Sequence, residues 1–106
     1  MRHVRKSGDH HERLHVQDSE LEFKIMARRN RLVGEWAAEK LGLSGDEAQA
    51  YAKEVVKADF EEPGEEDVVR KIMADFKAQN ISVSDSELRQ EMLKRLGTAR
   101  RQLTPE

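Results

Sequence analysis

The chain has 106 residues, of which 37% are hydrophobic and 38% carry a charged side chain, so it can form one small domain with a modest core. Its net charge of −2 argues against a general binder of nucleic acid or of a membrane surface. No cysteine is present and no stretch approaches the ~20 apolar residues of a membrane span, so we exclude disulfides, zinc–sulfur sites and membrane insertion, and expect a cytoplasmic protein.

Residues 1–17 hold all four histidines and few apolar side chains. Since little apolar surface is available to offset the entropy of ordering, we predict a mobile polar N-terminal extension, or a frayed helix start, before residue 18. His11 and His15 have the i, i+4 spacing of some metal ligands. Solvated histidines in a tail are the favoured interpretation, so no metal site is predicted.

The stretch from residue 18 to residue 42 contains the only tryptophan of the chain, Trp36, and its broadest apolar surface. On a helical wheel the apolar residues cover roughly 200°, against roughly 100° for a helix buried on one side only. This width predicts the central helix of a bundle, with partners on two flanks. Gly34 in mid-helix costs about 1 kcal/mol relative to alanine, which indicates close approach by a neighbouring helix.

Three further helices are predicted at 45–61, 65–79 and 85–102. Two of them start at capping boxes, Ser44 with Glu47 and Ser84 with Glu87, and Pro63-Gly64 marks the break between the second and third. Short connections make successive helices antiparallel neighbours. We therefore predict an all-α fold, a four-helix bundle over residues 18–106 that follows a flexible tail at 1–17. The predicted core residues are Trp36, Val55, Phe60, Ile72, Phe76, Leu88, Met92 and Leu96.

Two charged residues, Arg29 and Asp59, fall inside the apolar arcs of adjacent helices. Burying a charge is costly unless it is paired, so we predict that they form a buried polar pair or share one hydrogen-bond network. The alternative is that both lie at bundle edges and reach water along their side chains.

No catalytic constellation is predicted: the chain lacks a Gly-rich phosphate loop and a nucleophile elbow, and His11 and His15 are interpreted as solvated histidines. The basic cluster at 28–31 makes Arg28 and Arg31 candidates for contact with a nucleotide phosphate. The residues of this cluster point in different directions round a helix, however, so we do not expect them to form one patch.

Several short segments of the sequence are distinctive: Phe23-Lys24, Ala27-Arg-Arg-Asn30, Trp36-Ala-Ala38, 50–57, 59–62 and the run from Asp75-Phe76 to Ser84-Asp85. Together they resemble the zeta subunit of the alpha-proteobacterial F-type ATP synthase over about residues 18–103. The resemblance implies a soluble, non-catalytic regulator, monomeric when free, that docks on the catalytic head of the synthase and binds ATP or ADP weakly without a tightly held cofactor. In inhibitory members, a mobile N-terminal segment becomes helical and inserts between catalytic subunits.

The N-terminal segment departs from the phenylalanines and acidic residues that the resemblance implies for inhibitory members. No aromatic residue precedes Phe23, and the only sizeable apolar side chains between Lys6 and Leu21 are Leu14 and Val16. Leu14, Val16 and Leu21 are therefore the candidate partner-binding residues, and we expect inhibition to be weak or absent. Two alternatives are an ATP- or ADP-sensing bundle and a structural interaction module, both independent of the synthase.

Overall fold

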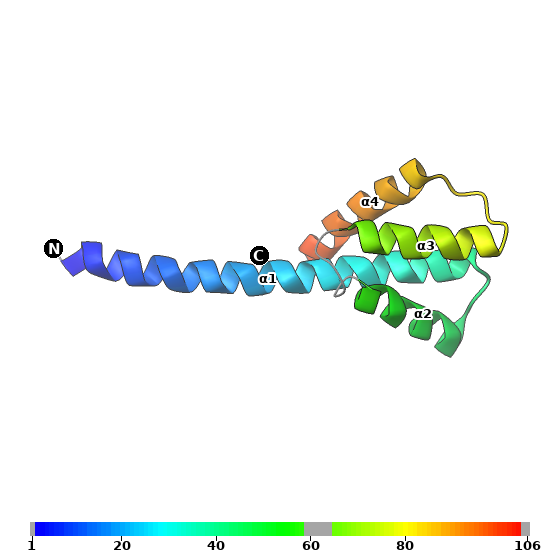
Figure 1. The fold of residues 1–106 in the computed structure, drawn as a ribbon. Helices are drawn as coiled ribbons and strands as arrows, with labels where there is room; N and C mark the ends of the chain where they lie inside the picture. The colour runs from blue at the N-terminus through cyan, green and yellow to red at the C-terminus, as the bar shows by residue number, and fades with distance from the viewer. Residues whose placement is uncertain (1, 59–64, 105–106) are drawn as a thin grey trace.

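The computed structural model describes the backbone of residues 2–58 and 65–104, and the side chains of residues 19–58 and 65–104. Four helices follow one another: α1 (Arg2–Lys40), α2 (Gly45–Ala58), α3 (Glu66–Ala78) and α4 (Asp85–Leu103). Figure 1 shows α2, α3 and α4 gathered around the C-terminal half of α1, while its N-terminal half projects away from them. The described residues contain no strand, which confirms the predicted all-α, four-helix architecture.

The first helix begins earlier than predicted, at Arg2 instead of close to residue 18. Nothing in residues 2–17 stops a helix, because this segment contains no proline and Gly8 is its only glycine. Extending an existing helix by one residue is far easier than nucleating a new one, so the backbone helix continues from the bundle into the polar segment. The mobility of residues 1–17 and a domain boundary at residue 18 stay predictions.

α1 is the central helix, as predicted, and its contacts with α2 and α4 are the most extensive between described helices. Five predicted core residues are buried in the structure: Val55, Ile72, Phe76, Leu88 and Met92. On α1 the fully buried apolar residues are Ile25, Val33, Ala37 and Ala38. Across the described residues, no helix is both long and apolar enough to cross a lipid bilayer.

Trp36 and Leu96, which were predicted to be largely buried, are partly buried and not exposed. The Trp36 indole packs on the outside of the core, edge-on to Phe76, with ring centroids 5.9 Å apart. The Lys40 ammonium lies 5.6 Å from the Trp36 ring centroid. Phe60, the remaining predicted core residue, lies outside the described residues.

Gly34 brings the backbones of α1 and α2 into contact. A Cβ atom at this position would lie 2.8 Å from the Cα atom of Ala52 and 3.2 Å from the Cβ atom of Val55. A backbone atom at such a distance cannot give way as a flexible side chain can, so only glycine fits. The close approach predicted from the sequence is confirmed.

The turn before α4 also matches its prediction. Asn80 ends α3 with a φ of +59°, the left-handed conformation that asparagine tolerates. The Ser84 hydroxyl accepts a hydrogen bond of 3.0 Å from the Glu87 amide, and the Glu87 carboxylate accepts one of 3.1 Å from the Ser84 amide. Both hydrogen bonds of the predicted capping box are therefore present.

The other predicted capping box, between Ser44 and Glu47, is not formed within the described part of the chain. Gly45, between them in sequence, has a φ of +58°. This left-handed residue turns the chain at the start of α2, so the Ser44 hydroxyl does not lie over the free amides of the first helical turn. The Ser-x-x-Glu pattern does not reveal this turn, because the pattern assumes a helical residue directly after the cap.

Candidate functional site

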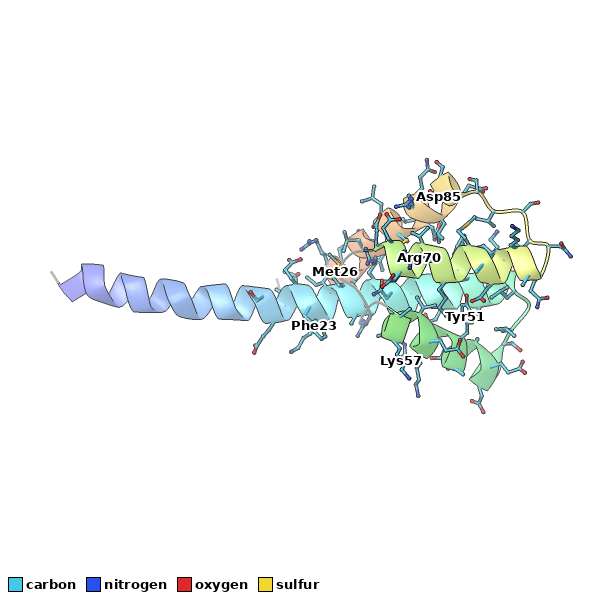
Figure 2. The ribbon with its side chains drawn as sticks, in the orientation of Figure 1. Phe23, Met26, Tyr51, Lys57, Arg70 and Asp85 are labelled. Carbon is cyan, nitrogen blue, oxygen red and sulfur yellow. The ribbon has the colours of Figure 1, made fainter. Side chains whose placement is uncertain are left out.

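The three candidate partner-binding residues lie along α1. Leu14 and Val16 belong to its projecting half, at positions where the structure describes the backbone but not the side chains. Leu21 is partly buried at the point where α1 enters the bundle. Phe23, two residues further on, is 57% exposed, and Figure 2 shows it on the surface of α1 at the edge of the bundle.

α4 is fastened to α1 at this same place. The Arg100 guanidinium donates two hydrogen bonds to the Glu22 carboxylate, of 2.7 and 3.1 Å. These hydrogen bonds lower the pKa of Glu22. The ion pair therefore marks the root of the projecting half, beyond which no other helix of the described chain accompanies α1 (Figure 1).

A groove with a volume of about 560 Å³ opens beside this root. It runs along α1 past residues of α2 and of the C-terminal end of α4, and it combines apolar and cationic side chains. We call it the basic groove. Its lining residues are Phe23, Lys24, Ala27, Arg28, Arg31, Leu32 and Glu35 of α1, Val56 of α2, and Gln102 and Leu103 of α4.

Arg28 and Arg31 both line the basic groove, which corrects our expectation that they would not share a patch. Arg28 Nη1 donates to Gln102 Oε1 at 2.6 Å, and Arg31 Nη2 donates to Gln49 Oε1 at 2.6 Å. Arg29 and Asn30, which lie between them in the sequence, are buried. Of the four residues of the basic cluster, only Arg28 and Arg31 therefore line the groove. Contact of Arg28 and Arg31 with a nucleotide phosphate stays a prediction.

Arg29 is buried, with a side chain only 6% exposed. Its Nε atom donates to Asn30 Oδ1 at 2.9 Å, and its Nη1 atom lies 3.7 Å from Glu65 Oε1. Asn30 itself is fully buried, and its Nδ2 atom has no hydrogen-bond partner among the described residues. The predicted pairing of Arg29 with Asp59 is untested, because Asp59 lies outside the described residues.

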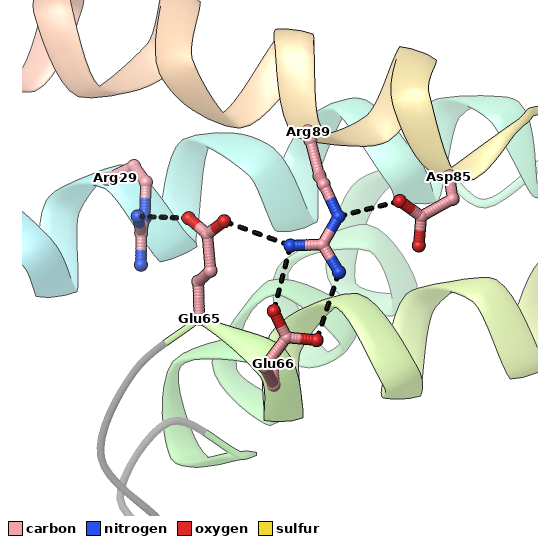
Figure 3. Close-up of polar contacts among 5 residues, drawn as sticks. All are labelled: Arg29, Glu65, Glu66, Asp85 and Arg89. Atoms are coloured by element: carbon pink, nitrogen blue, oxygen red, sulfur yellow. Dashed lines mark hydrogen bonds and ion pairs between the residues drawn. The ribbon is translucent and has the colours of Figure 1, made fainter.

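Glu65 links Arg29 to a larger network of charges on the other helices (Figure 3). The Arg89 guanidinium of α4 binds Glu65 at 3.1 Å, Glu66 through two hydrogen bonds of 2.9 Å, and Asp85 at 2.6 Å. The hydrogen bonds from Arg89 lower the pKa of Glu66, and those to Glu66 and Asp85 raise the pKa of Arg89. The network thus connects α1, the start of α3 and α4.

Sequence reasoning missed the roles of Glu65 and Arg89. The available signal was the position of Glu65 directly after the Pro63-Gly64 break. A carboxylate at the start of a helix is favourable to the helix dipole, which is a local effect. Its contacts with α1 and α4 depend on the way the helices cross, and a helical wheel does not contain that information.

A second polar cluster joins α2 to α3 on another side of the bundle. The Tyr51 hydroxyl donates to Asp75 Oδ2 at 2.7 Å, and Lys71 Nζ lies 3.1 Å from the same oxygen and 3.2 Å from Glu54. Burial and the hydrogen bond to Asp75 raise the pKa of Tyr51 well above its usual value. A phenol held in its neutral form in this way acts as a structural hydrogen-bond donor.

Among the described side chains, no group of three or more histidine, cysteine, aspartate or glutamate residues is arranged to hold a metal ion. All four histidines lie in residues 1–17, where side chains are not described.

Comparisons with known proteins agree with this architecture. The sequence model described as "ATPase inhibitor subunit zeta" matches residues 1–102. A protein structure solved by solution NMR is 51% identical to this chain, with a TM-score of 0.70, and the match covers 78% of this chain and 94% of the other. No protein with a curated description matches. Because the family match spans almost the whole sequence, the chain belongs to the ATPase inhibitor subunit zeta family.

Proposed function

We propose that this protein is a non-catalytic regulatory subunit of an F-type ATP synthase, which acts as a cytoplasmic monomer and binds the catalytic head of the enzyme. Family membership supports this role. The structural observation that carries the proposal is the projecting half of α1. Residues 2–17 extend a continuous backbone helix beyond the bundle, and sixteen helical residues span about 24 Å, a length suited to an intersubunit groove.

The composition of the projecting half limits how firmly it can bind. A helix held in a groove needs apolar anchors at i, i+3, i+4 and i+7. Leu14 and Leu21 supply one such pair, seven residues apart, and Val16 is the only other sizeable apolar residue nearby. We therefore propose that inhibition by this protein is weak or absent at neutral pH. Protonated histidines would add charge below about pH 6.5, so inhibition should strengthen on acidification.

The test is a dose–response of ATP hydrolysis by the matching synthase, with the full chain and with a variant lacking residues 1–17, at neutral and mildly acidic pH. We expect little inhibition at neutral pH, more at acidic pH, and none with the shortened variant. Potent inhibition that survives the deletion would refute a mechanism based on the projecting helix. Potent neutral-pH inhibition that the deletion abolishes would show that the anchors suffice.

Nucleotide sensing independent of the synthase is the alternative function. The observation in its favour is that Arg28 and Arg31 line one groove, so two guanidinium groups are available to one phosphate chain. An NMR titration of the free protein with ATP or ADP tests this alternative. Saturable shifts at the Arg28 and Arg31 amides, lost in an Arg28→Gln/Arg31→Gln variant, would support nucleotide binding in the basic groove.

A further inference from the structure

We propose that the basic groove is a docking surface for an acidic, partly apolar segment of the catalytic head. The inference rests on the proposed function, because it takes the head as the partner. It adds a second point of attachment, on the bundle itself, which residues 1–17 do not form. The groove would hold the bundle against the head whether or not the projecting helix inhibits.

The charge of the groove selects an acidic partner. Its lining includes the cations Lys24, Arg28 and Arg31, and Glu35 is its single carboxylate. This excess of positive charge stands out on a chain whose net charge is −2. Complementary charge speeds association and excludes wrongly charged partners, so an acidic segment is the occupant that this surface favours.

Hydrogen bonds orient the arginines of the groove without cancelling all of their charge. Arg28 donates to the neutral amide of Gln102, and no carboxylate lies within ion-pair distance of it among the described residues. Arg31 donates to Gln49, and its Nε atom lies 3.6 Å from Glu35. Guanidinium groups held in place lose less entropy when they bind a carboxylate. The two arginines are thus prepared for an anionic partner.

The apolar part of the groove favours a protein segment over a free ion. Leu32, Val56 and Leu103 line it together with the cations, and burying such surface contributes only if the occupant is itself partly apolar. Phe23 lies at the end of the groove where α1 leaves the bundle and is 57% exposed. Exposed aromatic side chains beside arginines are typical anchors of protein interfaces.

The position of the groove supports the head as the source of this segment. Phe23 and Lys24 line the groove and follow directly after the Glu22–Arg100 ion pair at the root of the projecting half. A partner that holds the projecting helix must therefore pass beside the groove. The two contacts would therefore be neighbours along α1.

The experiment measures binding of the full chain to the purified catalytic head of the matching synthase. A Lys24→Glu/Arg28→Glu variant reverses two charges of the groove, and Lys57→Glu/Lys77→Glu makes the same change in net charge at exposed positions that do not line the groove. We expect the groove variant to bind roughly tenfold more weakly, mainly through slower association and with a reduced salt dependence. The control should bind as the unmodified chain does.

Thermal melts must first show that both variants are folded. A Lys24→Gln/Arg28→Gln variant removes the two positive charges without adding repulsion, so it should bind with an affinity between those of the unmodified chain and the charge-reversed variant. A photoreactive residue in place of Ala27, which lines the groove, then identifies the occupant. A cross-linked peptide of the head that is rich in aspartate and glutamate supports the proposal. A basic or neutral peptide, or no cross-link to the head, overturns it.

The outcomes separate this proposal from the proposed function. If the unmodified chain does not bind the head, both fail. If it binds and the groove variant binds equally well, the proposed function stands and the docking surface is wrong. If ATP binding is lost in the groove variant while head binding is unchanged, the groove is a nucleotide site and the docking proposal is overturned.

Discussion

The two halves of α1 share one backbone helix but differ in what stabilises it. In the C-terminal half, Ile25, Val33 and Ala37 are fully buried against the other helices. The N-terminal half projects without a helical neighbour among the described residues, and its sequence offers few apolar side chains. Isolated helices of such length are marginal in water. The bundled half is therefore fixed by packing, whereas the projecting half depends on helix propensity and on whatever partner it meets.

The sharpest test of this difference makes the same kind of truncation in each half. Ile25→Ala should lower the free energy of unfolding by about 2–5 kcal/mol, because Ile25 is fully buried and its truncation leaves a cavity in the core. Leu14→Ala, the matched change in the projecting half, should lower it by less than about 0.5 kcal/mol. Urea denaturation of both variants measures the two values. Equal losses would mean that residues 1–17 fold together with the bundle.

The next test concerns the buried charge in the bundled half. If Asp59 pairs with Arg29, Asp59→Ala should cost about 2–3 kcal/mol, somewhat less than the ~3–5 kcal/mol of a fully stranded charge, because Glu65 remains close to Arg29. Asp59→Asn is the matched variant, because it removes the charge and keeps the shape of the side chain. A loss below roughly 1 kcal/mol in denaturation experiments would place Asp59 at the surface instead.

Two glycine substitutions test how closely α1 and α2 pack in the bundle. Gly34→Ala should destabilise the protein by about 1–3 kcal/mol although alanine favours helices, because its Cβ atom would meet the Ala52 backbone. Gly97→Ala in α4 is the control. Its nearest neighbour would be a flexible Arg101 nitrogen at 3.7 Å, so it should stabilise by up to about 1 kcal/mol. Thermal melts that rank the two in the opposite order would contradict the close contact.

The smallest expected effect is that of acid on the bundle. Arg89 lowers the pKa of Glu66 below its ordinary value of 4.5, so the stability contributed by this pair is present above that value. It is lost as the pH falls through the lowered pKa of the folded state. Glu66→Gln should therefore reduce the loss of stability on acidification, measured as the melting temperature between pH 6 and pH 3. If the melting temperature of the variant depends on pH as that of the unmodified chain does, Glu66 contributes nothing to the loss of stability in acid.

The bundled half was largely predictable from the sequence, whereas the projecting half was not. Gly34 in mid-helix and the capping box at Ser84 are signals that can be read within one helix or turn, and the structure confirms what they predict. The start of α1 was predicted at the wrong residue because the prediction relied on composition. Composition shows how little apolar surface residues 2–17 can bury, but it does not show where the backbone helix begins.

The candidate site was only partly predictable, because it depends on how helices cross. Arg28 and Arg31 were identified, but their shared groove needs residues of α2 and α4 beside α1. Glu65 reaches Arg29 from the start of another helix. A helical wheel places residues around one axis and contains neither relation.

The contact at Gly34 has a mechanical consequence. Because the Ala52 backbone fits against a position of α1 without a side chain, a slide of α2 along α1 would bring it onto a residue one helical turn away, such as Asn30 or Ala38. The two helices therefore have a single axial register. A pull on the projecting end of α1 cannot be relieved by slippage of one helix past the other, and so loads the whole α1–α2 interface at once.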